Sequence, residues 1–325
     1  MRRFKSRAPR PDLPSPAQVI TDAIIARLEA GTRPWRKPWT GTAPQRPLRS
    51  CGTPYRGGNI FWLWLVADML GYGSPYWMTY AQAAALGGQV RKGEKATIAI
   101  FYKTYAKRSH DEATGEEVTE NRRVLRSYHV FNADQVEGLP ARFHLHPPYA
   151  ERPIEADRLA EITAFFDMIP ATTRHGGDHA YYSPIGDYIQ LPPPEAFTDA
   201  ERYGATRAHE CSHWSGGEKR LNREFGKRFG DDAYAAEELV AELSSAILGS
   251  ELGLPVEHLD SHASYIAGWL RILKADSRAL LAIASKADAA ATYLLGLAGR
   301  HPTHDIEEPV ETGANDDCFS AQQAA

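Results

Sequence analysis

Hydrophobic and polar residues follow each other along the first half of the chain with periods that indicate both helices and strands. Apolar residues recur at helical spacing between Ser15-Pro16, a typical helix start, and Gly31, a typical helix stop. The full pattern predicts, in order, helices over 15–30, 59–70 and 79–86 and strands over 96–102 and 124–131. A polar stretch over 109–121 separates the strands, so a hairpin with a long loop is expected. This part of the chain is predicted to form a small α+β domain over 15–137.

The second half shows a longer series of helical patterns. They predict a helix over 154–169, a short hairpin of 180–182 with 188–191, and helices over about 199–215, 233–252, 262–283 and 285–298. Four prolines between 138 and 153 indicate a linker before this second domain. The ends, a basic tail over 1–14 and a polar, acidic tail over 301–325, are expected to be disordered. The predicted fold class is α+β: a small α+β N-terminal domain is followed by a mainly helical domain with a short β-sheet over 154–300.

The composition is typical of a soluble globular protein, with 43% hydrophobic and 24% charged residues. The longest apolar run, Ile60–Ala67, is far shorter than the roughly 18 residues of a membrane span, so no membrane partner is expected. The basic N-terminus leads into proline-rich sequence, which argues against a secretory signal. The three cysteines, Cys51, Cys211 and Cys318, lie far apart without Cys-x-x-Cys spacing. No disulfide framework is therefore expected, and the predicted location is a reducing cytoplasm.

The charge of the chain is divided unequally between its halves. Residues 1–150 carry 22 Lys and Arg against 12 Asp and Glu, a balance of +10, whereas the rest of the chain balances at −14. Basic residues in the first half are interleaved with aromatic ones, a mixture that suits single-stranded DNA because cations track phosphates and flat rings stack on unpaired bases. The candidate DNA-binding residues are Arg33, Trp35, Arg36, Lys37, Trp39, Tyr55, Arg56, Arg91, Lys92 and Lys95. Trp62 and Trp64 lie in the apolar second helix and are predicted to belong to the core.

The most specific chemical motif is His209-Glu210-Cys-Ser-His213, in one of the predicted helices. Histidines four residues apart lie one turn apart on the same helix face, so His209 and His213 can bind one Zn²⁺ ion. Glu210 lies beside the first ligand, where it can act as general base on a water molecule activated by the metal. Thr198 and Glu201 form a capping-box signature at the start of this helix. The motif predicts a zincin-type metallopeptidase domain.

A catalytic zinc site needs a third protein ligand, and the next helix supplies carboxylates. Its sequence from Glu237 to Glu242 resembles the gluzincin arrangement, in which a second helix donates a glutamate ligand. On that resemblance Glu238 is the third metal ligand, and Glu242, one turn later, holds a ligand histidine through its other ring nitrogen. Glu237 is the rival third ligand because it lies one position away. His262, at the start of the following helix, is the candidate catalytic group for stabilising an oxyanion, with Tyr234 as the alternative.

Several short motifs occur in the same order as in a known family. They are Gly31–Trp39, Tyr55–Asn59, Trp77–Gln82, Val90–Lys95, His209–His213, Arg220–Asn222, Glu237–Glu242 and His262–Ile266. Over roughly residues 15–300 the chain resembles the plasmid-borne antirestriction proteins of the ArdC family and the related N-terminal region of conjugative TraC primases. The resemblance implies an N-terminal domain that binds single-stranded DNA and a C-terminal zincin-like domain. It also implies protection of incoming plasmid or phage DNA from host restriction, with a host restriction-system protein as a further partner.

Three functions fit these observations. The first is an antirestriction protein that binds single-stranded DNA and holds a divalent metal in a peptidase-like site. Zn²⁺ is the expected metal, and Mn²⁺ or another divalent ion is the alternative, because two histidines and a glutamate tolerate several metals. The second is a true metalloprotease whose basic half recruits it to proteins bound to DNA. The third is a DNA-binding module with a purely structural metal, whose removal unfolds the second domain.

Overall fold

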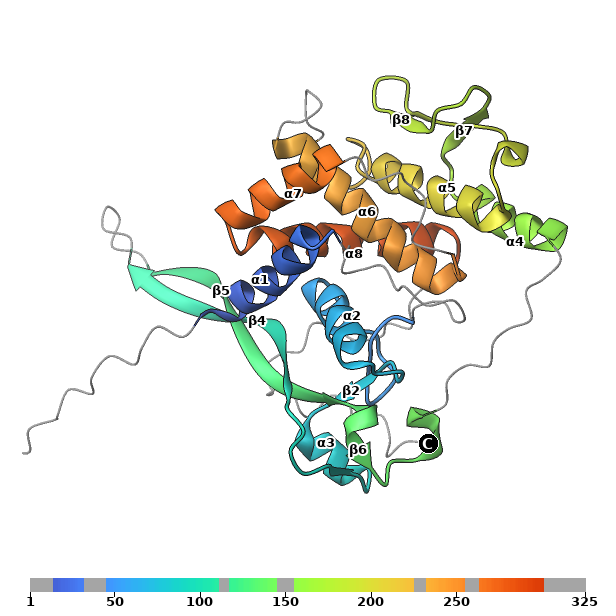
Figure 1. Cartoon of the computed structure of the whole chain (residues 1–325). Helices are drawn as coiled ribbons and strands as arrows, with labels where there is room; N and C mark the ends of the chain where they lie inside the picture. Colours follow the sequence, from blue (N-terminus) through green and yellow to red (C-terminus); the bar gives the residue numbers. More distant parts are fainter. Residues whose placement is uncertain are drawn as a thin grey trace, which may run out of the picture.

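A four-stranded sheet organises the N-terminal half of the chain (Figure 1). The computed structural model describes residues 14–31, 45–110, 117–144, 155–224, 232–254 and 263–300. The strands of the sheet are β1 (Leu48–Arg49), β2 (Tyr76–Met78), β4 (Thr97–His110) and β5 (Glu117–Asn132), in the order β1-β2-β5-β4. The predictions made for the two terminal tails lie outside the described residues.

β4 and β5 pair as a long antiparallel hairpin that extends away from the rest of the molecule in Figure 1. Both strands of the predicted hairpin are present, but the loop expected over 109–121 is partly wrong. β4 continues to His110 and β5 begins at Glu117, so both ends of that polar segment are strand. Backbone pairing with the neighbouring strand stabilises these polar ends, and alternation of apolar residues cannot reveal such pairing.

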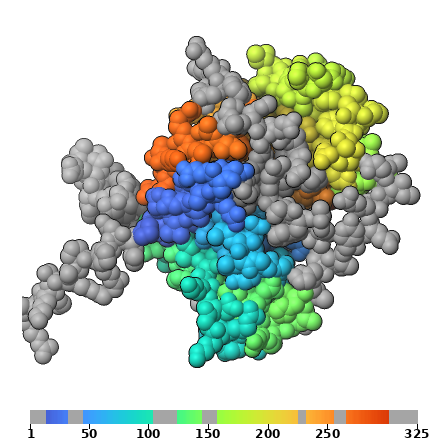
Figure 2. Space-filling model, in the orientation of Figure 1, coloured from blue at the N-terminus to red at the C-terminus, as the bar shows by residue number. Residues whose placement is uncertain are grey.

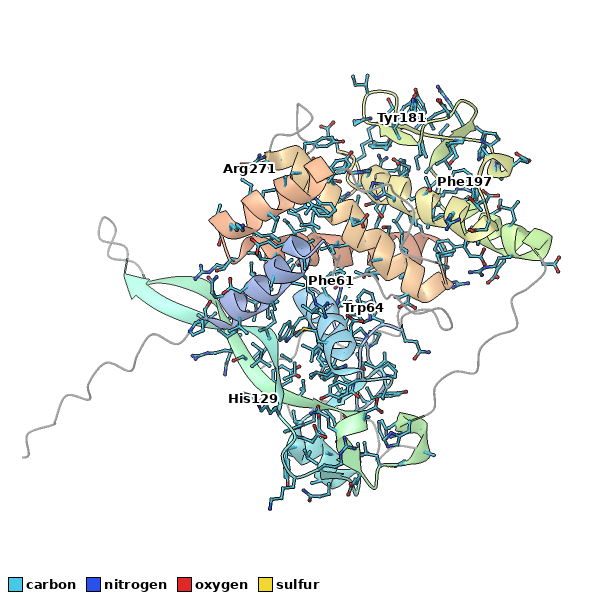
Figure 3. The ribbon with its side chains drawn as sticks, in the orientation of Figure 1. Phe61, Trp64, His129, Tyr181, Phe197 and Arg271 are labelled. Carbon is cyan, nitrogen blue, oxygen red and sulfur yellow. The ribbon has the colours of Figure 1, made fainter. Side chains whose placement is uncertain are left out.

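Helices and a second small sheet complete the described part of the N-terminal half: α1 (Pro16–Glu29), α2 (Gly58–Leu70), α3 (Tyr80–Ala85), β3 (Gln89–Val90) and β6 (Val136–Glu137). The side chain of Ser15 accepts a hydrogen bond from the backbone N–H of Gln18, which confirms the predicted start of α1. α2 is buried over most of its length, which explains why its sequence is apolar on all sides. Its Trp62 and Trp64 belong to the core, as predicted. Figure 3 shows Trp64 on this helix beside Phe61.

The C-terminal half is mainly helical. Its described elements are α4 (Glu155–Asp167), β7 (Thr172–His175), β8 (Tyr181–Ser183), β9 (Tyr188–Leu191), α5 (Ala200–Ser215), α6 (Asp232–Leu252), α7 (Ala263–Ala275) and α8 (Ala279–Leu297). The predicted hairpin is confirmed as β8 paired with β9, whereas β7, which pairs parallel to β9, is largely exposed and shows no alternation that would predict it. The last two helices are separated earlier than predicted: α7 ends at Ala275 instead of near 283, and α8 begins at Ala279. Between them the Asp276 side chain accepts a hydrogen bond from the N–H of Arg278 and stabilises a turn. The predicted α+β class is confirmed.

The two halves share a continuous hydrophobic core. α1 packs against α7 and α2 packs against α8, and in Figure 2 the atoms of α1 (blue) lie directly against those of α7 (orange). The approach is very close at Gly58, where a Cβ atom would lie 2.6 Å from the side chain of Leu281. The Thr21 hydroxyl donates a hydrogen bond to the carbonyl of Ser277, 2.7 Å away. The chain stays packed on the N-terminal half as far as Phe143, a fully buried residue within the predicted linker.

α8 lies inside this shared core. The helix has 19 residues and is long and apolar enough to cross a membrane by length and composition alone. It packs against α2, α5 and α6, and a helix at the centre of a folded protein has the same apolar composition. We therefore interpret α8 as a core helix. Of the cysteines in the described residues, Cys211 is free and buried.

Candidate metal centre

The metal motif lies on α5, which is buried along most of its length. The helix begins one residue later than the capping signature predicts. The side chain of Asp199, not Thr198, accepts a hydrogen bond from the N–H of Arg202, in keeping with the stronger capping preference of aspartate. His209 and His213 project from the same face of the helix, as predicted, and their Nε2 atoms lie 3.1 Å apart.

Glu238 on α6 completes a cluster with these two histidines. Its Oε1 atom lies 3.5 Å from His213 Nε2, and its Oε2 atom lies 3.7 Å from His209 Nε2. One ligand atom from each of the three residues lies within 4.8 Å of the others. Two nitrogens bound to one tetrahedral metal lie about 3.3 Å apart, so the separation of the imidazoles fits a shared ion. Two imidazoles and one carboxylate form a donor set that suits Zn²⁺ or Mn²⁺.

Glu237 approaches His213 from the other side of its ring. The Glu237 Oε1 atom lies 3.3 Å from His213 Nδ1, while Nε2 of the same ring faces Glu238. Glu237 therefore orients His213 through its second ring nitrogen rather than serving as a metal ligand. Glu242 is buried one turn further along α6, and its assigned role stays a prediction.

Arg223 fixes Glu237 in place. Its Nη2 and Nε atoms donate hydrogen bonds to the two carboxylate oxygens of Glu237, over 2.7 Å and 3.0 Å. The same guanidinium donates to the Ser215 hydroxyl and to the Ser212 carbonyl at the end of α5. A buried ionic chain thus links Arg223 through Glu237 to His213. The sequence pattern does not reveal Arg223, because a connection between helices has no period that shows where its side chains point.

We expect Glu237→Gln to weaken metal binding by about 10- to 100-fold, the usual effect of removing a partner that orients a ligand histidine. The amide keeps the shape of the side chain but loses the charge that attracts the His213 ring. The affinity can be measured on the full chain by competition with a chelator. Glu242→Gln is the matched comparison on the same helix. If that substitution lowers the affinity and Glu237→Gln does not, the orienting carboxylate is Glu242.

Burial and close pairing shift the pKa values of the cluster in opposite directions. Burial favours the neutral form of Glu238, but the charges of His213 and His209 outweigh it and lower the pKa of the carboxyl group to about 2. Burial also opposes protonation of His213, yet Glu238 and Glu237 raise the pKa of its imidazole to about 9. The carboxylate is therefore ready to bind a metal at neutral pH, whereas the imidazole must first lose a proton.

Metal affinity is consequently expected to rise with pH. Below the His213 pKa of about 9, each metal ion that binds displaces one proton, so the affinity should increase about tenfold per pH unit between roughly pH 6.5 and pH 8.5. Glu238 adds no dependence in this range, because it is ionised well above its pKa of about 2. Competition titrations at several pH values, corrected for protonation of the chelator, measure the slope. A constant affinity across the range would contradict the expectation.

Glu210 lies beside the cluster, at the next position of α5. Its carboxylate is buried and accepts a hydrogen bond from the backbone N–H of Tyr182 on β8. Burial raises the pKa of Glu210, against the opposing charges of His209 and His213, and a raised pKa makes a carboxylate a stronger base. Burial also raises the pKa of the neighbouring Cys211 to about 12, so its thiol is not a nucleophile at neutral pH.

Two tyrosine hydroxyls lie on the α6 side of the site. The rings of Tyr234 and Tyr265 are stacked with centroids 6.3 Å apart, and their hydroxyl oxygens lie 3.3 Å apart. The Tyr234 hydroxyl also forms a hydrogen bond with Glu238. Burial and the charges of Glu238 and Glu210 raise the pKa of Tyr265, so its hydroxyl stays protonated and can donate a hydrogen bond. His262 lies outside the described residues, and its role stays a prediction.

The predicted DNA-binding residues fall into three groups. One group lies outside the described residues: Arg33, Trp35, Arg36, Lys37 and Trp39. Tyr55 is buried in the core, 2% exposed, so in this arrangement its ring offers no face to a base. Arg56 and Arg91 each form an ion pair with a nearby carboxylate. Lys92 and Lys95 are exposed, as a contact to phosphate requires.

A metal-binding His-His-Glu group carried by two packed helices, with a further glutamate beside it, defines the C-terminal half as a zincin-like metallopeptidase domain. The family model described as zincin-like metallopeptidase matches residues 160–286. The model for the N-terminal domain of anti-restriction factor ArdC matches residues 15–131. The chain belongs to the ArdC antirestriction family, which confirms the resemblance seen in its motifs.

Several relatives are similar to almost the whole described chain. The metal-free crystal structure of antirestriction protein ArdC from plasmid R388 is 44% identical, with a TM-score of 0.73, over 88% of this chain and 98% of that one. The Mn(II)-bound structure of that protein is 42% identical, with a TM-score of 0.71, over 87% and 98%. The uncharacterised protein y4eC of Sinorhizobium fredii (strain NBRC 101917 / NGR234) is 41% identical over 283 residues, which are 85% of this chain and 90% of y4eC. DNA primase TraC of Escherichia coli is 37% identical over 296 residues, covering 86% of this chain but 27% of the primase.

Proposed function

We propose that this protein protects DNA entering a host from restriction by combining single-stranded DNA binding with metal-dependent peptide hydrolysis. The observation that carries the hydrolytic part is Glu210, a buried carboxylate beside a cluster of metal-binding side chains. A structural zinc site is closed by four protein ligands and needs no base. The described residues supply three ligands, which leaves a position for water or substrate. Zn²⁺ is the expected ion, and Mn²⁺ is the alternative.

The residues around the cluster divide the work of hydrolysis between them. When bound, the divalent ion is a Lewis acid that activates water and polarises the carbonyl of the scissile peptide bond. Glu210 takes a proton from the attacking water and delivers it to the leaving amine, so the C–N bond breaks with its nitrogen protonated. The Tyr265 hydroxyl donates a hydrogen bond to the carbonyl oxygen as negative charge develops on it. Glu237 holds His213 in the orientation that binds the metal.

β8 offers a place for an extended peptide substrate. Within the described residues it is an edge strand of the β7-β9-β8 sheet, and the N–H of Tyr182 on this strand already reaches Glu210. Extended peptides commonly bind by adding a strand to an exposed sheet edge. A peptide that pairs with β8 would pass Glu210 and so bring its backbone to the metal ligands.

Single-stranded DNA and a host restriction-system protein are the proposed partners. The first 150 residues carry the charge excess of +10 and include the ArdC-type N-terminal domain, and a basic surface binds nucleic acid by releasing its counterions. A protein bound to the transferred DNA is a peptide substrate that would link the two activities. We expect the protein to act in the cytoplasm, where entering DNA meets restriction enzymes.

A DNA-transfer assay tests the proposed function. Plasmid DNA without the host's methylation is moved into a restricting host that expresses the chain or lacks it, and survival of the DNA is expected to rise with the chain. Binding is tested separately with purified full-length protein and labelled oligo-dT, where the Kd should increase steeply with salt. Folded, metal-loaded protein that gives no protection would overturn the proposed role.

A further inference from the structure

Cations and aromatic rings lie together on one face of the N-terminal sheet. They are Arg49 on β1, Phe101 and Lys103 on β4, and Arg126 and Tyr128 on β5, and together they form the sheet strip. In Figure 3 the label of His129, the residue after Tyr128, marks the part of β5 that carries the strip. The sequence motifs do not point to these residues, because on their own they read as the solvated face of a strand.

The register of the hairpin brings four of these side chains together. Phe101 on β4 is paired with Arg126 on β5. Lys103 lies two residues beyond Phe101, and Tyr128 lies two residues beyond Arg126. Paired residues share a face of a sheet, and so do residues two apart along a strand. The rings of Phe101 and Tyr128 pack edge to face with centroids 5.8 Å apart.

The same face continues across β2 to β1. Arg49 is paired with Trp77, and Trp77 is paired with Asn132, which lies an even number of residues from Tyr128. Trp77 and Asn132 are buried, whereas the residues of the strip are half-buried or exposed. Among the described side chains, the strip is therefore a part of this face that the fold leaves at least partly uncovered. The Arg49 guanidinium lies 5.6 Å from the centre of the Tyr55 ring, and the Tyr55 hydroxyl bonds Tyr128.

Two cations of the strip are not neutralised by a carboxylate in the described part of the chain and can therefore bind an anionic ligand. Lys103 and Arg126 are exposed and form no ion pair with any residue in the described ranges. The other candidate arginines are engaged: Arg56 is paired with Asp288, 3.1 Å away, and Arg91 with Glu94. Two uncompensated cations beside the half-buried ring of Phe101 match the chemistry of a polyanion that also presents flat, unpaired bases.

We propose that the sheet strip binds single-stranded DNA, with Lys103 and Arg126 on phosphates and Phe101 stacked on an unpaired base. The proposal rests on the proposed function and places the DNA on a specific surface. A duplex offers the same phosphates but keeps its bases stacked on one another, so the ring selects single strands. The Tyr128 ring packs edge to face against Phe101 and so fixes its position. Arg49 adds a positive charge on β1, on the same face of the sheet.

Full-length variants test the strip by fluorescence anisotropy with labelled oligo-dT of about 20 nucleotides, longer than the usual single-strand site. Lys103→Ala/Arg126→Ala is expected to weaken binding about tenfold or more at low salt. It should also reduce the slope of log affinity against log salt by about 1.4, because each phosphate contact on a single strand contributes about 0.7. Phe101→Leu should weaken binding about 5- to 150-fold, the range for one stacked base, and leave the slope unchanged.

Arg142→Ala is the matched control, because Arg142 is an exposed cation of the same half, on the 3-10 helix Ala141–Phe143 that follows β6. Its affinity and salt slope should match those of the wild type, and equal metal content and thermal midpoints show that every variant is folded. If the double variant binds DNA like the wild type, the sheet strip is not the DNA-binding surface, and the proposed function is unaffected. Wild-type protein that does not bind single-stranded DNA overturns both. Phe101→Leu that weakens duplex binding as much as single-strand binding overturns the stacking role.

Discussion

Glu210→Gln is expected to reduce peptide hydrolysis by about 10²- to 10⁴-fold, the usual contribution of a positioned general base. Glutamine has nearly the same shape and still accepts the hydrogen bond from the Tyr182 N–H, but its amide does not take up a proton from water. The variant should keep its metal, because Glu210 is not one of the three clustered ligands. Survival of transferred DNA should then fall to the level of a host that lacks the chain. The measurement is the transfer assay, with metal content determined on wild type and variant.

The outcome separates the possible roles of the metal. Cys211→Ala is the matched control, since it alters the next residue of the same helix and its thiol takes no part in the proposed reaction. That variant should still protect DNA. Full protection by a metal-loaded Glu210→Gln protein would contradict a role for hydrolysis and leave the metal a structural one. In that case a chelator should unfold the protein rather than merely abolish its activity.

The metal site could be predicted from sequence only as far as a single helix determines it. His209 and His213 share a face because residues four apart lie one turn apart, whatever the rest of the fold does. Glu238 depends on how α6 packs against α5, and resemblance to a known arrangement supplied it. The same resemblance gave an orienting role to Glu242, which stays a prediction, but it did not point to Glu237, the carboxylate at His213 Nδ1. One residue turns a side chain by about 100° around a helix, so the crossing of two helices decides which neighbour meets the ring.

The limits of the fold prediction have a similar physical cause. Most helices were predictable because periodic burial leaves periodic apolar residues, as in α1 and α4. β7 and the polar ends of the β4–β5 hairpin were not, because they form by backbone pairing with a neighbouring strand, and such pairing leaves no apolar period in the sequence. The unequal charge and the proline-rich segment over 138–153 suggest two separate domains, but both are surface properties. They carry no information on whether α1 and α2 bury their apolar faces against α7 and α8.

Because the core is shared, Asp288→Ala is expected to destabilise both halves together, by about 3–5 kcal/mol. Asp288 lies on α8 and is 4% exposed. Its carboxylate accepts hydrogen bonds from Arg46 and Arg56 and from the backbone N–H of Gly57, all in the N-terminal half. Arg46 is itself buried, so removing the carboxylate leaves a buried guanidinium without its counter-charge. The substitution therefore weakens the contact between the two halves, and both halves lose stability together.

Two probes can follow this loss in a urea titration of the full chain. Five of the seven tryptophans precede residue 80, so intrinsic fluorescence reports mainly on the N-terminal half, while metal release reports on the C-terminal half. Both midpoints should coincide in the wild type and shift equally in Asp288→Ala. Lys286→Ala, an exposed position on the same helix, should change the stability by less than about 0.5 kcal/mol. Separate transitions, or a shift seen by one probe alone, would mean that each half folds independently. In that case a fragment ending at Phe143 would fold by itself. The shared core predicts instead that such a fragment exposes the apolar faces of α1 and α2 and does not fold.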